Sequence, residues 1–241
     1  MTMYGYYPYG YGFDPGYLLV LITAILSVVA SARVSSTFKK FSQKATSRGI
    51  TGEQAARKIL DENGLYDVKV ERVSGNLTDH YDPRTNVIRL SDSVHSSTSV
   101  AAVGVAAHEA GHAVQHATGY APIKLRNAIV PVANIGSMAG PYLIIIGLLL
   151  SGTMSDILLN LGVWFFSAAV LFQLVTLPVE FNASKRAVAT LKNGMYLYED
   201  EVPAVRKVLT AAAMTYVAAA AVSIANLLRF IMLIGGRRRN D

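Results

Sequence analysis

The 241-residue chain contains no cysteine and few charged residues. The absence of cysteine excludes disulfides, thiolate nucleophiles and cysteine-ligated metals. Asp, Glu, Lys and Arg together make up 16% of the residues, against about 25% in an ordinary soluble domain. The deficit is uneven, because long apolar runs alternate with one polar stretch that carries most of the charge. This pattern predicts membrane-spanning helices together with one domain in water.

The formal net charge of +6 would favour nucleic acid as a partner if the chain were a soluble protein. Many of the basic residues instead flank the apolar runs, where Lys and Arg fix the orientation of membrane spans. We therefore expect the lipid bilayer as a partner and no nucleic acid. The sequence contains no internal repeat and leaves the oligomeric state open.

Four apolar runs approach or exceed the roughly 17–25 residues that a helix needs to cross a bilayer. The first run, 17–32, follows a Tyr- and Gly-rich tail at 1–16 and contains Ala30-Ser31-Ala32, which resembles a signal-peptidase site. No basic residue precedes this run, so we favour an uncleaved anchor over a signal peptide. The next two runs form a predicted hairpin over 129–177. The last run, 209–234, precedes a basic tail at 235–241.

The polar stretch at 33–128 predicts a small α+β domain. Thr51 and Gln54 have the spacing of a capping box, which predicts a helix over Glu53–Asn63. Alternating residues predict strands at Val68–Val73 and Asn86–Leu90. A further helix is predicted over Ser99–Ala117, and a separate helical segment at 178–208 follows the hairpin.

The helix predicted over Ser99–Ala117 contains the sequence His-Glu-Ala-Gly-His at residues 108–112. Residues four apart lie on one face of a helix, so the imidazoles of His108 and His112 can bind one tetrahedral zinc ion. Glu109 is placed to take a proton from a zinc-bound water and to pass it to the leaving amine. This pattern predicts a metallopeptidase with one zinc ion per chain and Glu109 as its catalytic base.

A hydrolytic zinc site needs a third protein ligand. His116 is nearest along the chain, but an unbroken helix turns it by about 80° and moves it about 12 Å from His108. Glu180 is the stronger candidate, because a carboxylate beside a membrane span is costly unless it is paired or bound to a metal. The predicted hairpin also returns Glu180 to the face that holds His108. An ion pair of Glu180 with Lys185 or Arg186 is the alternative.

Taken together, four short segments resemble the bacterial neutral zinc metallopeptidase family of the YugP type over nearly the whole chain. The segments are DHYDPR at 79–84, IRLS at 88–91, HEAGHA at 108–113 and EFNAS at 180–184. The chain is more distantly similar to membrane peptidases of the heat-shock and CAAX-processing type. The resemblance implies a multi-pass α-helical membrane protein with a small zincin-like (gluzincin) metallopeptidase domain, and Glu180 as a metal ligand beside His108 and His112.

The resemblance also shows one departure, since Ser184 stands where the wider group has Asp. The carboxylate that would orient a ligand histidine is then missing or supplied elsewhere, with Asn182 and Asp79 as candidates. Gluzincin-like folds often bind substrate as an added strand at a sheet edge, and Asn86–Leu90 is either that edge or part of an ordinary hairpin. His116, Tyr120 and Arg186 are candidates for stabilising the oxyanion.

The distribution of basic residues predicts which side of the membrane holds the site. Residues 33–126 contain thirteen Lys and Arg and residues 178–208 contain five, whereas 1–16 and 151–156 contain none. The positive-inside rule then places the site in the cytoplasm of a bacterial cell. Four crossings from an outside N-terminus would also leave the C-terminus outside, which conflicts with its three consecutive arginines. We expect peptide or membrane-protein substrates, with a zinc-stabilised scaffold and a metal transporter as the rival functions.

Overall fold

The computed structural model describes residues 15–237. The tyrosines of the tail and the last two of the three C-terminal arginines lie outside these residues. The described elements are α1 (Pro15–Ser42), α2 (Gly52–Glu62), β1 (Lys69–Val73), β2 (His80–Asp82), β3 (Val87–Ser91), α3 (Val100–Ala117), α4 (Ala121–Leu149), α5 (Thr153–Asn193) and α6 (Val202–Arg237).

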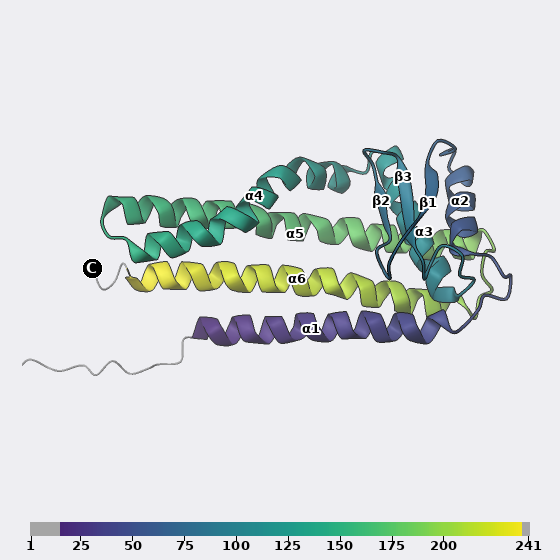
Figure 1. Ribbon diagram of the computed structural model, residues 1–241, viewed down its shortest axis with the longest axis horizontal. Helices are drawn as coiled ribbons and strands as arrows, with labels where there is room; N and C mark the ends of the chain where they lie inside the picture. Colours follow the sequence, from purple (N-terminus) through teal and green to yellow (C-terminus); the bar gives the residue numbers. More distant parts are fainter. Residues whose placement is uncertain (1–14, 238–241) are drawn as a thin grey trace, which may run out of the picture.

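Four long helices lie side by side and carry the small sheet, α2 and α3 at one end (Figure 1). Helices α1, α6 and α5 follow one another in this order and α4 crosses α5, and each of the four is long and apolar enough to cross a membrane. Large apolar side chains point outward from them, with Leu149 80% and Trp164 77% exposed. Such a surface is unfavourable in water and suits contact with lipid.

The helices are longer than the predicted apolar runs. Helix α1 continues to Ser42, and α4 begins at Ala121 and contains Pro131 and Pro141. Helix α5 runs without a break through Pro178, so the second half of the predicted hairpin and the segment with Glu180 form one 41-residue helix. Proline is tolerated inside membrane helices because neighbouring groups satisfy the freed carbonyl. No helix end therefore separates residues 177 and 178.

Helices α4 and α5 approach closely through glycines. A side chain on Gly136 would overlap the carbonyl oxygen of Phe165, and one on Gly162 would meet Ile144 and the carbonyl of Gly140. Small residues allow this approach where lipid provides no hydrophobic force between helices. The hairpin of α4 and α5 is thus held by backbone-to-backbone packing.

The small domain confirms most of the predicted local structure. The capping box of Thr51 and Gln54 is present at the start of α2, and Ser99 caps α3. The sheet order is β1–β3–β2, with β1 parallel and β2 antiparallel to β3. The short β2 was not predicted. It makes Val87–Ser91 the central strand, so of the two alternatives for Asn86–Leu90 the structure agrees with the hairpin, formed with β2, and not with the sheet edge.

Helix α3 is the core of this domain and joins it to the long helices. Residues 100–107 are buried apart from the half-buried Val105, and the helix packs against α2, α5 and α6. Gly104 lies against Val205 of α6, and Gly111 lies against the backbone of Ala183 on α5. The small residues before the motif therefore let α3 sit tightly on α5.

We predict that Gly136→Ala lowers the thermal stability of the purified protein in detergent. The added methyl group overlaps Phe165, and overpacking of this kind costs about 1–3 kcal/mol. Gly235→Ala is the matched control, because its methyl group would meet nothing within 4 Å. Equal melting temperatures for the two variants would contradict close packing of α4 on α5.

Candidate metal centre

Two helices supply the side chains of the candidate metal centre. Helix α3 presents His108 and His112 on successive turns, with Glu109 directly after His108, and α5 presents Glu180 two residues after Pro178. Glu180 is only 2% exposed, and Glu109 and His112 are also buried. A buried carboxylate so close to an apolar run requires a cationic or metal partner.

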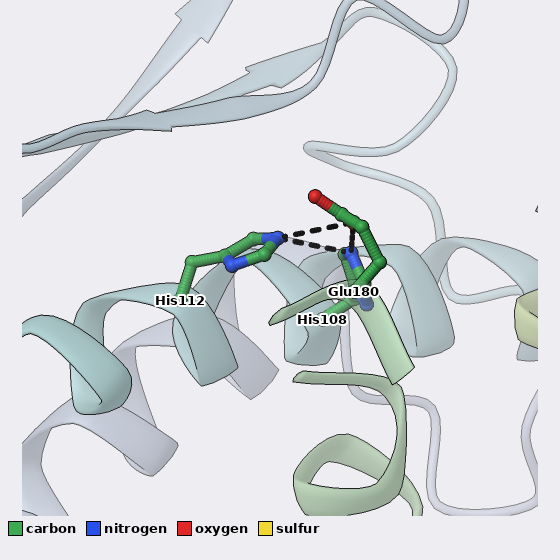
Figure 2. Close-up of side chains that lie close together, drawn as sticks. All are labelled: His108, His112 and Glu180. Carbon is green, nitrogen blue, oxygen red and sulfur yellow. Dashed lines mark hydrogen bonds and ion pairs between the residues drawn. The ribbon is translucent and has the colours of Figure 1, made fainter. Parts of the chain in front are cut away.

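The three predicted ligands converge on one point (Figure 2). His108 Nε2 lies 3.3 Å from Glu180 Oε2 and 3.2 Å from His112 Nε2. His112 Nε2 lies 3.5 Å from the same carboxylate oxygen. Three ligand atoms from positions 108, 112 and 180 thus form a nearly equilateral triangle.

This triangle has the size of one face of a zinc coordination tetrahedron. Zinc lies about 2.0–2.1 Å from imidazole nitrogen and carboxylate oxygen, which places tetrahedral ligand atoms about 3.3 Å apart. The three separations, 3.2, 3.3 and 3.5 Å, fall around this value. The residues present therefore fit a zinc ion held by three protein ligands, with a fourth position open.

The far nitrogen of each histidine has its own partner. His108 Nδ1 lies 3.2 Å from Ser184 Oγ, and His112 Nδ1 lies 3.0 Å from Gln115 Oε1. If each Nδ1 carries the proton, each Nε2 presents a lone pair to the shared point. Ser184 thus occupies the orienting position beside His108 that the resemblance assigned to an Asp.

Gln115 ties the site to α5. Its side-chain nitrogen donates to the carbonyl of Val179 at 2.8 Å and to Asn182 Oδ1 at 3.0 Å. Arg186 Nε donates to the same Asn182 oxygen at 2.8 Å. Asn182 therefore helps to hold the Gln115 side chain, which in turn contacts His112 Nδ1. Arg186, a candidate oxyanion donor from the sequence, is occupied in this chain of hydrogen bonds.

The electrostatic environment favours a cation at the centre. Burial opposes the charged form of His112, but Glu180 and Glu109 outweigh that effect, and the pKa of His112 is raised. The same carboxylates would favour a bound metal ion. Arg126 from α4 lies 3.8 Å from Glu180 Oε1, on the carboxylate oxygen that does not face the histidines.

Asp79 belongs to the surroundings of Glu109 rather than to those of a ligand histidine. It accepts hydrogen bonds from the backbone nitrogen and the hydroxyl of Ser91, at 2.7 and 2.9 Å. Burial raises the pKa of Asp79 against these hydrogen bonds, and the nearby Glu109 raises it further. Two carboxyl groups thus lie close together on this side of the site.

His116 lies outside the triangle of ligand atoms. Its ring packs edge-on against Tyr81 of β2, with 5.5 Å between the ring centroids. Burial, followed by the nearness of His112 and Arg126, lowers the pKa of His116. It is therefore a neutral group between β2 and the site at neutral pH. Tyr120, the remaining oxyanion candidate, precedes α4 as its N-cap residue.

Sequence reasoning missed Arg126 and Tyr216. Arg126 pairs with Glu180 from α4, and Tyr216 of α6 interacts with both Glu180 and Glu109. Arg126 begins an apolar run, and Tyr216 interrupts an alanine-rich one. A polar residue within or beside an apolar run was the available signal in both cases. The packing of α4 and α6 around α5 is what brings both residues to the site.

Comparisons with known proteins show the family of the chain. The model of the family described as "Putative neutral zinc metallopeptidase" matches residues 16–235, and the chain belongs to this family. It is 50% identical over 226 residues to "Putative membrane protease YugP" of Bacillus subtilis (strain 168), covering 93% of this chain and 99% of that relative. No solved structure matches the chain.

We predict that Gln115→Leu weakens zinc binding by about 10–100-fold, the usual cost of removing the group that orients a metal-ligating histidine. The variant removes the acceptor of His112 Nδ1 and leaves the ligand atoms in place. Competition with a chromophoric chelator measures the affinity. Gln173→Leu, on α5 and away from the site, is the control and should bind zinc like the parent. Unchanged affinity in Gln115→Leu would exclude this orienting role.

Proposed function

We propose that the protein is a zinc-dependent membrane metalloendopeptidase of the gluzincin kind. The observation that carries the proposal is the triangle of His108 Nε2, His112 Nε2 and Glu180 Oε2, whose edges match tetrahedral zinc. Family membership supports the peptidase activity. The proposal includes a zincin-like fold for the small domain.

Each side chain has a role in peptide hydrolysis. A zinc ion at this centre would polarise the scissile carbonyl and lower the pKa of an attacking water molecule. Glu109, beside His112 on the same helix, accepts the proton of the attacking water and later delivers it to the leaving amine. Ser184 and Gln115 hold the two imidazoles in the tautomer that ligation needs.

The oxyanion is assigned to Tyr216 and Arg126. A phenol and a guanidinium interact with the Glu180 carboxylate from α6 and α4, so both are donors beside a proposed zinc ligand. Hydrogen-bond donors in this position stabilise a tetrahedral intermediate. They replace Tyr120 and Arg186 as candidates, and His116 stays a third donor on the β2 side.

The outer edge of β2 is the proposed site for an extended substrate. Strand β3 is already paired on both sides, whereas β2 lies at a sheet edge and packs against α3. Tyr81 of β2 contacts His116 one turn beyond His112, which links this edge to the site. A peptide added along β2 would use backbone hydrogen bonds and so accept varied sequences.

The two rival functions, a zinc-stabilised scaffold and a metal transporter, have less support from the structure. A purely structural zinc site needs no general base beside an open position, yet Glu109 is buried next to His112. A transporter needs ionisable groups along the membrane path. The apolar runs of α4 and α5 between Pro131 and Pro178 contain one such residue, Asp156, beside the turn that joins the helices.

We predict that Glu109→Gln retains about one zinc ion per chain but hydrolyses unfolded casein about 10²–10⁴-fold more slowly, because the proton acceptor is gone. Both forms are purified in detergent, and bound zinc is measured by atomic emission. Removal of zinc by a chelator should stop the parent enzyme, and added zinc should restore it.

Two results would oppose the peptidase proposal. If parent and variant both hold zinc and cleave no unfolded or membrane-protein substrate, the zinc-stabilised scaffold gains support. If neither holds zinc after reconstitution, the assignment of His108, His112 and Glu180 as ligands fails.

The site is proposed to face the cytoplasm of a bacterial cell, with four crossings by α1, α4, α5 and α6. The eighteen Lys and Arg of residues 33–126 and 178–208 support this orientation. Helix α6 has 36 residues and reaches the end of the molecule where α1 begins (Figure 1). The basic C-terminal tail is therefore an exception to the positive-inside rule under this proposal.

We predict that a membrane-impermeant thiol reagent labels Ser151→Cys in intact cells and labels Ser74→Cys only after lysis. The chain has no cysteine of its own, so each variant carries a single thiol. Ser151 lies in the exposed turn between α4 and α5, and Ser74 lies in the exposed segment after β1. Labelling of Ser74→Cys in intact cells would place the site outside.

A further inference from the structure

A groove of about 1120 Å³ runs between α1 and α6, away from the metal centre. Its lining is basic at one end and apolar at the other. Lys40 and Arg206 stand at the end near the small domain, and Leu26 and Ala221 stand at the other end. Because the two helices are antiparallel, the groove runs from the small domain toward the middle of the helix layer (Figure 1).

The end near the small domain is strongly basic. Arg33, Lys40, Arg206 and Lys207 line it and are exposed, and none forms an ion pair within residues 15–237. Lys192 and Glu199 also line the groove and pair with each other at 3.9 Å. Four like charges around one hollow repel each other unless an anion lies between them.

The rest of the groove is apolar. Leu26 and Val29 of α1 face it together with Met214 and Val217 of α6, and Leu26, Val29 and Met214 are 52%, 56% and 44% exposed. From Lys207 to Ala221 the lining of α6 extends by about 21 Å along the helix axis. This distance suits a hydrocarbon chain lying along the helices with its polar end at the cations.

We propose that this groove binds an anionic phospholipid, with the phosphate of the headgroup between Arg33, Lys40, Arg206 and Lys207 and an acyl chain between α1 and α6. Charge complementarity selects an anion, and the adjoining apolar floor selects one that carries a hydrocarbon chain. Basic pockets between membrane helices bind phosphorylated headgroups in this way. The proposal is independent of the peptidase activity.

The test compares two double variants with the parent protein, all delipidated in a neutral detergent. Arg206→Gln with Lys207→Gln removes two groove cations, and Lys39→Gln with Lys44→Gln removes two exposed cations at the same level outside the groove. Each protein is titrated with phosphatidylglycerol, phosphatidylcholine or glycerol phosphate. Native mass spectrometry counts bound lipid, and the shift in melting temperature reports occupancy.

The parent and the Lys39/Lys44 variant should bind phosphatidylglycerol at least tenfold more tightly than phosphatidylcholine. The Arg206/Lys207 variant should lose about thirtyfold in affinity for phosphatidylglycerol, taking each basic residue at its usual contribution near an anionic headgroup. Its melting temperature without lipid should equal that of the parent, since the replaced side chains are exposed and unpaired among the described residues.

Three outcomes would overturn the proposal. Equal affinity of the parent for the two lipids removes the anion requirement. Equal losses in the two double variants move the site away from the groove. Protection by glycerol phosphate equal to that by phosphatidylglycerol makes this a site for free phosphate esters rather than for lipid.

Discussion

The structure depends on the burial of one carboxylate, Glu180, where α5 passes from its apolar run to the small domain. This group is 2% exposed and lies within 3.3–3.5 Å of two imidazole nitrogens. A carboxylate so placed is stable only with positive charge beside it. His108 and His112 of α3 and Arg126 of α4 surround it. The need of Glu180 for nearby positive charge therefore links α3, α4 and α5.

The contact of α3 with α5 provides the precision that such a site needs. Gly111, within the motif, lies against the backbone of Ala183, and an added side chain there would come within 3.0 Å of its carbonyl oxygen. The small residue between the two histidines is therefore as necessary as the histidines themselves. Because α5 continues unbroken for 41 residues, the carboxylate of Glu180 is held by a long element anchored in the helix layer.

The sequence predicted the local parts of the site better than its surroundings. Helical periodicity was enough to place His108 and His112 on one face, and the cost of a carboxylate near an apolar run pointed to Glu180. Ser184, Arg126 and Tyr216 could not be placed in the same way, because each reaches the site through tertiary packing. Ser184 was recorded only as a departure, yet its hydroxyl lies 3.2 Å from His108 Nδ1. The three-residue β2 was too short to show an alternating pattern. The sequence therefore could not decide whether Asn86–Leu90 lies at a sheet edge or within a hairpin.

The position of the site bears on where a peptidase of this kind would cut. On one side the centre faces the small sheet through His116 and Tyr81. On the other side a hollow of about 490 Å³ opens between α4 and α5, lined by Ala121, Pro122, Leu125, Leu174, Val175 and Pro178. This hollow is apolar, and Pro178 in its lining precedes Glu180 by two residues on α5. The centre thus lies at the boundary between polar and apolar surroundings. Under the proposed peptidase function, this position would favour cleavage in segments that emerge from the bilayer over cleavage at its middle. The charged residues of the sheet support the same location, since Asp82 of β2 and Arg89 of β3 form an ion pair that is unfavourable within a bilayer.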